Sequence, residues 1–468
     1  MCHTIAAIAT PPGSGGIGII KISGQDALSV AASVFRKSAP APEKGVSDTR
    51  HLKSFESHRF YHGHVADPEN GKVLDEVLLV FMQSPRSYTR EDIVEIHAHS
   101  GPLVLNAILS MVLRQGVRLA EPGEFTKRAY LSGRIDLTQA EAVIDIINAR
   151  TDGALEAATA QIGGHLKASV DSVREALLRI LAETEAAIDF PEDIEDSIDP
   201  EASLGLLRNE VIGKLMALTA QYEDAHYLRD GFRVLIVGRP NVGKSSLMNG
   251  LVRKDRAIVT SVPGTTRDLI EETLNIRGLP VIIADAAGLH QTDDPVEKLG
   301  IERTHAAIDD ADLILFMSDI SQPLARDESD IYERICHKKI ILVANKSDLV
   351  DDTVSPEIPD AWGDMPMVRT SAIYDKGLDS LRDQIAAAAT GGRGQMKSAI
   401  IPNLRHKGLL DQSLEAALAA AEGIRNDVSP ELISIDIQEA TDALGEIIGL
   451  TVREDILDHI FSNFCIGK

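Results

Sequence analysis

The sequence has little of several residue types, and each shortage excludes a class of protein. Its three cysteines, Cys2, Cys336 and Cys465, follow no framework spacing, which argues against a disulfide-stapled secreted domain and favours a reducing compartment. No apolar run approaches the roughly twenty residues that a membrane span needs. No basic stretch with a long apolar core opens the chain, as a signal peptide would. We therefore expect a cytoplasmic protein without a membrane partner.

Positive charge is also scarce. Lysine and arginine number 47 against 71 aspartate and glutamate residues, which gives a net charge of −24. This balance argues against a surface that coats nucleic acid, so any RNA contact must use a local patch or a basic partner. At 468 residues, the chain is long enough for two or three domains.

The most informative motif that is present is a phosphate-binding loop. Residues 238–245 read GRPNVGKS, with an apolar run at 234–237 before them and a helix-like segment at 246–249 after them. The motif G-x-x-x-x-G-K-[ST] requires this order of strand, loop and helix, because backbone N–H groups and the helix N-terminus wrap the phosphates. Lys244 then supplies a charge to the outer phosphates, and Ser245 offers its hydroxyl to Mg²⁺.

Further motifs follow at the ends of predicted strands, in the order of a GTP-binding domain. In the segment DAAG, Asp285 can hold Mg²⁺ through water and Gly288 can meet the γ-phosphate. In the segment NKSD, Asp348 can accept two hydrogen bonds from the N–H edge of guanine, where adenine offers the wrong pattern. Ser371 and Ala372, in the loop after a third apolar run, can contact the guanine carbonyl through their backbone.

The residue that follows DAAG departs from the small-GTPase template. The template places a glutamine there to orient the attacking water, but Leu289 cannot form hydrogen bonds through its side chain. Glu297 is the candidate carboxylate for this task. The segment GTTRD at 264–268 is the expected first switch, where a threonine hydroxyl can ligate Mg²⁺. We interpret Arg267 as a structural switch residue rather than a charge-supplying finger.

The rest of the chain divides around this block. Residues 4–119 mix helices with predicted strands such as 17–22 and 77–81. An alanine-rich region follows, in which an apolar stripe at helical spacing predicts a bundle helix containing Leu166, Val170, Val173, Leu177, Leu181, Thr184 and Ile188. An acidic break with a proline ends this helix, and a second helical stretch covers 200–229.

The predicted fold class is multidomain α/β plus all-α. We expect an α+β N-terminal domain over 1–121, a discontinuous helical domain over 122–229 and 395–468, and a Ras-like P-loop GTPase domain over 230–390. Helical sequence on both sides of the GTPase block indicates that this domain is inserted between the two helical parts.

Two other patterns favour structural interpretations. The G-x-G-x-x-G pattern at 13–18 precedes a β-branched run, and no acidic residue follows at the spacing of a dinucleotide-binding fold, so we interpret it as a tight glycine turn. Glu95, His97 and His99 share one face of a predicted strand and could converge on a metal. Because the sequence shows no fourth ligand, we favour a polar strand face that lines a pocket or interface.

Short motifs outside the GTPase block include ATPPG at 9–13, GEF at 123–125, DLTQAEA at 136–142 and CIGK at 465–468. With GTTRD, they make the whole chain resemble the MnmE (TrmE) family of tRNA modification GTPases, and CIGK is the most specific of them. The resemblance implies a K⁺-dependent GTPase that attaches an aminomethyl or carboxymethylaminomethyl group to the wobble uridine of certain tRNAs. The implied partner is the flavoprotein MnmG, which carries the FAD and forms a heterotetramer with it.

The resemblance further implies a tetrahydrofolate one-carbon derivative bound by the N-terminal domain and a constitutive homodimer through that domain. The GTPase domains are expected to meet across the dimer when GTP and K⁺ are bound. Folate binding maps to Lys21, Glu95 and Arg134. The family pattern has arginine at the first position and lysine at the third, so this chain keeps both charges but not the same hydrogen-bonding geometry.

Together the motifs and the resemblance give a set of expected site residues. The expected GTP contacts are Asn241, Val242, Gly243, Lys244, Ser245, Ser246, Thr260, Ser261, Val262, Pro263, Gly264, Thr265, Thr266, Asp285, Ala286, Ala287, Gly288, Asn345, Lys346, Asp348, Ser371 and Ala372. Among these, the expected Mg²⁺ ligands are Ser245 and Thr266, and the expected K⁺ ligands are Asn241, Thr260, Val262 and Thr265. The resemblance assigns the hydrolytic water to Glu297.

At the C-terminus, Cys465 and Lys468 are expected at a modification site, with Phe461 and Phe464 anchoring this tail on the helical domain. Cys465 has two open roles, chemistry through its thiol or packing. Two other functions also stay open at this point. A ribosome-assembly or RNA-chaperone GTPase shares the central motifs but does not explain CIGK. A nucleotide-gated scaffold would hydrolyse GTP slowly, only to reset itself.

Overall fold

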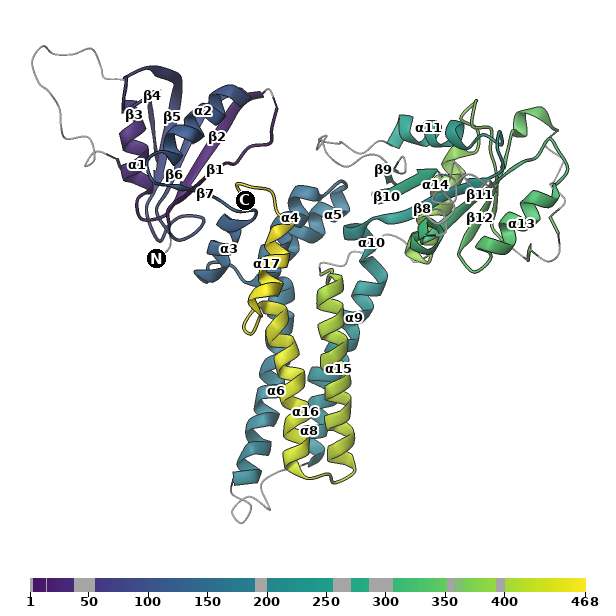
Figure 1. The fold of residues 1–468 in the computed structure, drawn as a ribbon. Helices are drawn as coiled ribbons and strands as arrows, with labels where there is room; N and C mark the ends of the chain where they lie inside the picture. The colour runs from purple at the N-terminus through teal and green to yellow at the C-terminus, as the bar shows by residue number, and fades with distance from the viewer. Residues whose placement is uncertain are drawn as a thin grey trace, which may run out of the picture. The chain divides into compact units, whose positions relative to one another are not determined.

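The computed structural model describes residues 3–13, 15–37, 55–189, 200–255, 271–285, 306–351, 358–359, 362–363, 365–392 and 400–468. The chain divides into two compact units, one made of Met1–Ile144 with Gly445–Lys468 and the other of Asp145–Leu444. Figure 1 shows the elements of both. Within the described ranges, no helix has the length and apolar character that crossing a membrane requires.

The first unit contains a seven-stranded sheet. Its strand order is β3-β4-β5-β6-β2-β1-β7, with β1 (Ile5–Ile8), β2 (Gly15–Ser23), β3 (Phe35–Lys37), β4 (Arg59–Ala66), β5 (Val73–Met82), β6 (Ile93–Ser100) and β7 (Arg118–Leu119). The strands predicted at 17–22 and 77–81 are confirmed. The glycine turn predicted at 13–18 is wrong in part, because β2 already begins at Gly15 and carries an irregularity in its pairing between Gly15 and Gly18.

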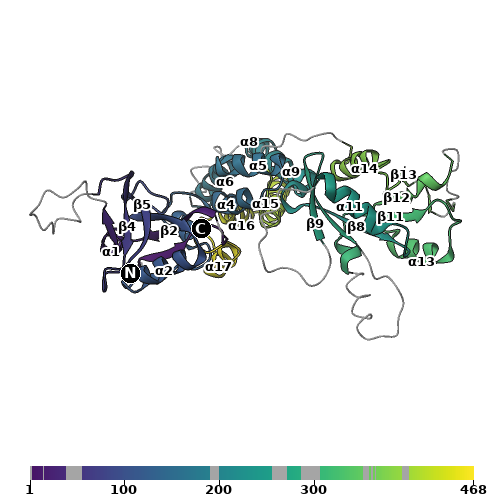
Figure 2. The same ribbon diagram turned by 90° about the horizontal axis from the view of Figure 1, so that it is seen from above.

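Two helices bury one face of this sheet. α1 (Ala27–Val34) and α2 (Pro102–Leu113) lie on the same side of the strands (Figure 2). They pack on strand residues that alternate along the chain, such as Ile20 and Ile22 of β2, and these side chains are fully buried. Alternation of this kind sends every second side chain to the opposite face. Lys21 therefore leaves the helix-covered core and faces the other way.

Three further helices complete the first unit, namely α3 (Glu124–Leu131), α4 (Leu137–Asn148) and α17 (Glu454–Ser462). A small apolar core joins the last two. Phe461 and Phe464 pack there with Leu137, Ala140 and Leu457. Both phenylalanines are buried, as an anchor for the tail requires.

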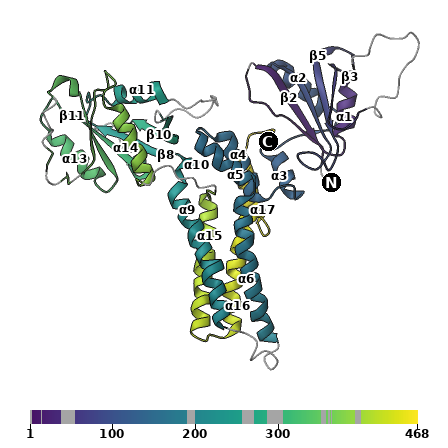
Figure 3. The same cartoon turned by 180° about the vertical axis from the view of Figure 1, so that it is seen from behind.

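The second unit contains a helical bundle. Its members are α6 (His165–Asp189), α8 (Pro200–Leu206), the π-helical segment Leu207–Ile212, α9 (Gly213–Ala225), α15 (Leu404–Arg425) and α16 (Pro430–Ile448); Figure 3 shows α6, α15 and α16 running alongside one another. The predicted apolar stripe is confirmed as one face of α6, with Thr184 and Ile188 only half-buried at its end. The π-helical segment interrupts the helix predicted at 200–229, and the sequence pattern gives no sign of it.

A six-stranded sheet forms the other part of this unit, in the order β13-β12-β11-β8-β10-β9. The strands are β8 (Phe232–Gly238), β9 (Glu271–Ile276), β10 (Leu279–Asp285), β11 (Leu313–Asp319), β12 (Ile340–Asn345) and β13 (Met367–Arg369), and all neighbours are parallel except β9 and β10. The helices α11 (Lys244–Asp255), α13 (Arg326–Ile335) and α14 (Leu378–Thr390) accompany the sheet. Parallel order brings the carboxyl ends of β8, β10, β11 and β12 to one edge, where such sheets bind ligands.

Candidate functional site

The loop between β8 and α11 has the backbone that a phosphate cradle needs. Asn241 and Gly243 have φ angles of +63° and +105°, so the chain turns through conformations that most side chains avoid. The side-chain amide of Asn345 donates to the carbonyl oxygen of Val242 at 2.8 Å. A Cβ atom at Gly243 would collide with that amide. Glycine is therefore required here, both for its backbone angle and for its lack of a side chain.

Lys244 places its charge inside the curve of this loop. Its Nζ donates to the carbonyl oxygens of Gly238 at 2.8 Å and Arg239 at 3.0 Å. Burial lowers the pKa of Lys244, although the nearby carboxylate of Asp285 partly opposes this. A partly desolvated ammonium is strongly stabilised when an anion approaches it. The position of Lys244 therefore favours phosphate binding in this loop.

Ser245 and Asp285, which the sequence predicts near Mg²⁺, lie together in the structure. The Ser245 hydroxyl donates to Oδ2 of Asp285 at 3.4 Å. Oδ1 of Asp285 is buried and, among the described residues, has no hydrogen-bond partner. Burial raises the pKa of Asp285, against the influence of Lys244 and Ser245. Hydroxyl and carboxylate oxygens with a free lone pair fit Mg²⁺ held partly through water.

The loops predicted to contact guanine differ in one respect from expectation. The Ser371 hydroxyl donates to Oδ1 of Asp348, which leaves the other carboxylate oxygen for a base. The backbone N–H groups of Ser371 and Ala372, however, donate inside the protein, to Lys376 O and to Asn345 Oδ1, both at 3.0 Å. The guanine contact assigned to these two amides therefore stays a prediction, and it would require one of them to change partner.

Sequence reasoning missed two members of this site. Asp319, at the end of β11, accepts a hydrogen bond from Lys346 Nζ at 2.7 Å. Burial opposes ionisation of Asp319, but hydrogen bonds from Lys346 and Ser321 outweigh it, so its pKa is lowered. The Thr370 hydroxyl donates to Asn345 Oδ1 at 3.1 Å. Asp319 stands at the end of an apolar run, as Asp285 does, and this shared position could have identified it from the sequence.

The structure leaves part of the expected site undescribed. Outside the described residues lie both expected switch segments, with Arg267, Leu289, Glu297, Thr260, Ser261, Val262, Pro263, Gly264, Thr265, Thr266, Ala286, Ala287 and Gly288. Of the four expected K⁺ ligands, the structure describes Asn241.

A second candidate site lies in the first unit. It contains the three residues assigned to folate. Lys21 on β2 pairs in register with Glu95 on β6, and their side chains lie 4.0 Å apart. Lys21 Nζ is 5.5 Å from the ring centre of Tyr88 and 5.3 Å from that of Phe125. The Arg134 guanidinium lies 4.6 Å from the Tyr88 ring centre and donates to the Tyr88 carbonyl at 3.2 Å.

The charged side chains of Lys21 and Glu95 are partly buried at this second site, and the pKa of each is shifted. Burial lowers the pKa of Lys21, which Glu95 opposes and Lys468 reinforces. A hydrogen bond from His97, at 3.2 Å, is the main reason that the pKa of Glu95 is lowered. A carboxylate next to aromatic rings and cations suits a flat heterocycle with an N–H edge and an anionic tail, as a folate has.

The alternative of a metal on β6 gains no support from the side-chain partners. His97 bonds Glu95, whereas His99 Nδ1 bonds Asp75 on β5 at 2.7 Å. Glu95, His97 and His99 therefore take part in two separate side-chain pairs, Glu95 with His97 and His99 with Asp75. In the described part of the chain, no group of three such side chains could hold a metal ion.

The C-terminal tail lies beside this second site. Ile466 forms an antiparallel bridge with Pro122, and the Phe125 N–H donates to the Lys468 carbonyl oxygen at 3.1 Å. A Cβ atom at Gly467 would collide with the carbonyl oxygen of Ile8. The tail thus reaches β1 as well as the segment before α3, which corrects the expectation of a dock on the helical domain alone. Cys465 is an exposed free thiol.

Two family models match the chain. The model described as "GTP-binding protein TrmE N-terminus" matches residues 4–134, and the "MnmE helical domain" model matches residues 137–465. Among full-length relatives named "tRNA modification GTPase MnmE", that of Geobacter sulfurreducens is 46% identical over 472 residues, and that of Alkaliphilus oremlandii is 44% identical over 469 residues. Each alignment covers 99% of this chain and 99% of the relative.

A solved structure, the G domain of the T. maritima FeoB iron transporter, matches 34% of this chain and 98% of its own length at 26% identity, with a TM-score of 0.27. The assignment rests instead on the family models and the full-length relatives. At this identity and coverage, the chain belongs to the MnmE family of tRNA modification GTPases.

Proposed function

We propose that this chain hydrolyses GTP as part of the modification of the wobble uridine of tRNA. Family membership supports the pathway, and the edge of the six-stranded sheet supports the chemistry. The single observation that carries the proposal is the convergence of Lys244, Ser245, Asp285 and Asn345 at the carboxyl ends of parallel strands. Asp348, in the turn after β12, gives the site its expected preference for guanine.

In this proposal, the residues act mainly by position and charge. Lys244 neutralises charge on the outer phosphates while the backbone N–H groups of the loop hold them. Ser245 and Asp285 would hold Mg²⁺, which supplies further charge neutralisation when bound. Attack of water on the γ-phosphorus breaks its bond to the bridging oxygen and releases GDP and phosphate. Phosphoryl transfer requires little covalent chemistry from the protein, so catalysis depends on where these side chains and their charges lie. Substitution of Lys244, Ser245 or Asp285 should therefore slow GTP turnover.

We assign a catalytic role to K⁺ through Asn241, with Thr260, Val262 and Thr265 as the other ligands. The position directly after DAAG, where the small-GTPase template has its catalytic glutamine, is Leu289 in this sequence. A K⁺ ion held by the four ligands would neutralise charge that develops on the phosphates during hydrolysis. Turnover should be faster in KCl than in NaCl by on the order of tenfold or more, because the smaller ion fits a ring of carbonyls poorly. Equal turnover in the two salts at matched ionic strength would remove the assignment.

Glu297 is assigned to the hydrolytic water. Glu297→Ala should lower turnover by on the order of a hundredfold or more and leave GTP affinity unchanged, because water is oriented mainly in the transition state. Single-turnover hydrolysis and nucleotide titration measure the two quantities. Glu333→Ala, at an exposed position of α13, is the matched control. A parallel fall in affinity would make Glu297 a structural residue.

The rest of the proposal concerns the one-carbon unit and the partners. Lys21, Glu95 and Arg134 would bind a tetrahydrofolate derivative, which supplies the one-carbon unit. The homodimer, the MnmG heterotetramer and the meeting of GTPase domains belong to the same proposal. Nucleoside analysis of tRNA from cells that lack this protein tests the function as a whole. If the wobble uridines stayed fully modified, the function would lie elsewhere, with ribosome assembly the first alternative.

A further inference from the structure

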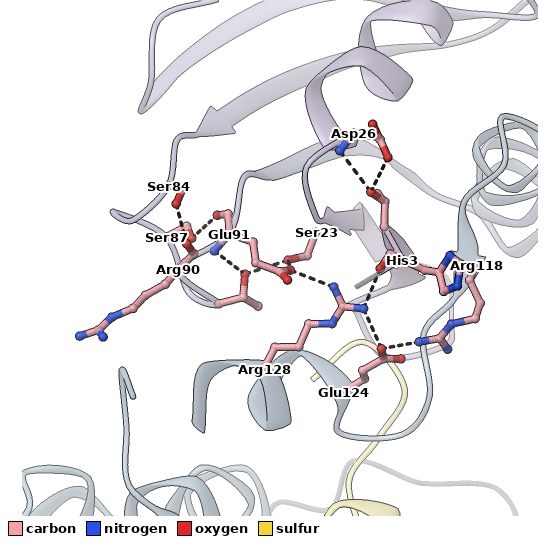
Figure 4. A network of polar contacts seen from close by, with 12 residues as sticks. His3, Ser23, Asp26, Ser84, Ser87, Arg90, Glu91, Arg118, Glu124 and Arg128 are labelled. Atoms are coloured by element: carbon pink, nitrogen blue, oxygen red, sulfur yellow. Dashed lines mark hydrogen bonds and ion pairs between the residues drawn. The ribbon is translucent and has the colours of Figure 1, made fainter. Parts of the chain in front are cut away.

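Figure 4 shows a polar network in which Arg128 bonds Glu91, Glu124 and His3. The guanidinium donates from Nη1 to Glu91 Oε2 at 2.9 Å, and from Nη2 to Glu124 Oε1 at 2.9 Å and to the His3 carbonyl at 2.8 Å. The same oxygen of Glu91 also accepts from the Ser23 hydroxyl at 2.7 Å. Arg128 is therefore bonded to three segments, namely the N-terminus, the β5–β6 loop and its own helix. Glu91 in turn links this network to Ser23 of β2.

The charges of this network are paired within it. Arg118 donates to Glu124 and also pairs with the exposed carboxylate of Glu121 at 3.6 Å. The Arg128 and Glu124 side chains are each only 11% exposed, and Arg128 pairs with both Glu91 and Glu124. Because each of these buried charges already has a partner of opposite sign, the network has no unpaired charge to offer a ligand. We therefore expect its contribution from the segments that it holds together.

The two segments that Arg128 joins each supply one ring beside Lys21. The β5–β6 loop carries Tyr88, three residues before Glu91, and α3 carries Phe125, three residues before Arg128. The two segments also meet where the Tyr88 hydroxyl lies 3.0 Å from Thr126 Oγ1. A shift of α3 against the loop would therefore change the spacing of the two rings around the Lys21 ammonium.

We propose that Arg128 is a positioning residue for the folate site. It fixes α3 against the β5–β6 loop, so that Tyr88 and Phe125 keep the spacing at which the ring system of a reduced folate can enter beside Lys21 and Glu95. This inference rests on the proposed function for its ligand. The link between helix and loop, however, can be tested without any ligand.

The geometry explains why arginine is needed at this position. A planar fork can donate to Glu91 from one nitrogen and to Glu124 and His3 from the other, whereas a lysine ammonium is a single point on a flexible stem. Arg128→Lys keeps the charge and loses the fork. Arg114→Lys is the matched control, because Arg114 lies in the same unit, is half-exposed and pairs only loosely with Asp67 at 3.5 Å.

The test compares the full-length wild type, Arg128→Lys and Arg114→Lys by calorimetric titration with 5-formyltetrahydrofolate. Arg128→Lys should weaken binding by on the order of tenfold, the usual effect of losing one buried charge-assisted hydrogen bond. GTP turnover should not change, because the nucleotide site lies in the other unit. In hydrogen exchange, segments 84–92 and 123–131 should exchange faster in Arg128→Lys than in the control.

A double-mutant cycle with Glu91→Gln separates positioning from general destabilisation. If Arg128 acts through Glu91, the double variant should bind folate no more weakly than the weaker single variant. Additive losses would show that the two residues act independently and would overturn the proposal. Unchanged exchange in both segments together with wild-type folate affinity would also overturn it. If the wild type itself did not bind the folate, the proposed folate function would fail, while the exchange measurement would still decide whether Arg128 links helix and loop.

Discussion

At the scale of single residues, Asn345 shows how a motif position can serve the architecture of a site. Its buried side-chain amide donates to Val242 O and accepts from Thr370 Oγ1 and from the N–H of Ala372. An amide carries its donor and its acceptor on two different atoms, so one short side chain can bond two loops at once. Asn345 thus ties the loop between β8 and α11 to the loop that carries Thr370 and Ala372. The base contact predicted for the neighbouring Asp348 is therefore separate from this structural role.

Asp348→Asn should move the base preference from guanosine to xanthosine nucleotides. The amide presents a donor where the guanine N–H needs an acceptor, and xanthine has an oxygen there. We expect the ratio of GTP to XTP affinity to fall by on the order of a hundredfold or more. Competition binding with the two nucleotides measures it, and Asp351→Asn, at an exposed position three residues on, is the control. An unchanged ratio would exclude Asp348 from base recognition.

At the scale of elements, the tail at 465–468 is held by backbone contacts rather than by its side chains. Its partners are the Pro122 bridge, the Phe125 N–H and the close approach of Gly467 to Ile8. The two buried phenylalanines of α17 and its following turn fix where the tail begins. The side chain of Cys465 is exposed and its thiol is free, so both of its open roles, thiol chemistry and packing, stay predictions.

Gly467→Ala should displace the tail without altering the GTPase domain. Gly467 has a φ angle of +94°, and a Cβ atom there would meet the Ile8 carbonyl. Modification of tRNA should fall by on the order of tenfold or more while GTP turnover stays near normal. Gly71→Ala is the control, since Gly71 also has a positive φ of +70° but open space around it. Equal tRNA modification in both variants would show that the docked tail is dispensable.

At the scale of the whole molecule, the chain crosses between its two compact units twice. Gly445–Lys468 belongs with the N-terminal unit, although 300 residues of the chain, Asp145–Leu444, separate it from Ile144. The Tyr130 hydroxyl donates to the Gly449 carbonyl at 2.6 Å, and Lys127 pairs with Asp458 at 2.6 Å. These contacts require the second unit to fold as an insertion between two segments of the first.

The first unit should lose stability in acid through Glu124. Burial alone would raise the pKa of Glu124, but hydrogen bonds from the Glu121 N–H, Arg128 and Arg118 outweigh it and lower the pKa below its ordinary value of 4.5. A depressed carboxylate pKa adds stability that is complete above that ordinary value and is lost as the pH falls through the native pKa. Glu124→Gln should therefore destabilise the first unit by about 3 kcal/mol at neutral pH and flatten its loss of stability in acid.

Hydrogen exchange in residues 4–134 measures this unit, while the fluorescence of Trp362, the chain's single tryptophan, reports the second unit, where its ring stacks on Tyr332. The Trp362 transition should be the same in Glu124→Gln and in the wild type. Glu121→Gln, which alters an exposed carboxylate, should leave both signals unchanged. A shift of the Trp362 transition in Glu124→Gln would mean that the two units do not unfold separately.

The sequence by itself placed the motifs of the expected nucleotide site at the ends of strands, although it missed Asp319 and Thr370. Each of its motifs is a short contiguous segment at the end of an apolar run, and parallel strand order brings such ends to one edge. The apolar stripe of α6 was equally readable, because helical periodicity is a local property. The resemblance, not periodicity, pointed to Lys21, Glu95 and Arg134.

Only the tertiary structure decided what surrounds those three residues. Their neighbours come from a loop, a helix and the C-terminal tail, which supply Tyr88, Phe125 and Lys468. The local sequence around each of these neighbours does not indicate which residue it contacts.

The same holds for most of the Arg128 network. Glu124 and Arg128 have the i,i+4 spacing of an ion pair on a helix, but no local pattern connects them to Glu91. Hydrophobic periodicity fixes which face of an element is buried, whereas the side chains that meet across elements depend on how those faces pack.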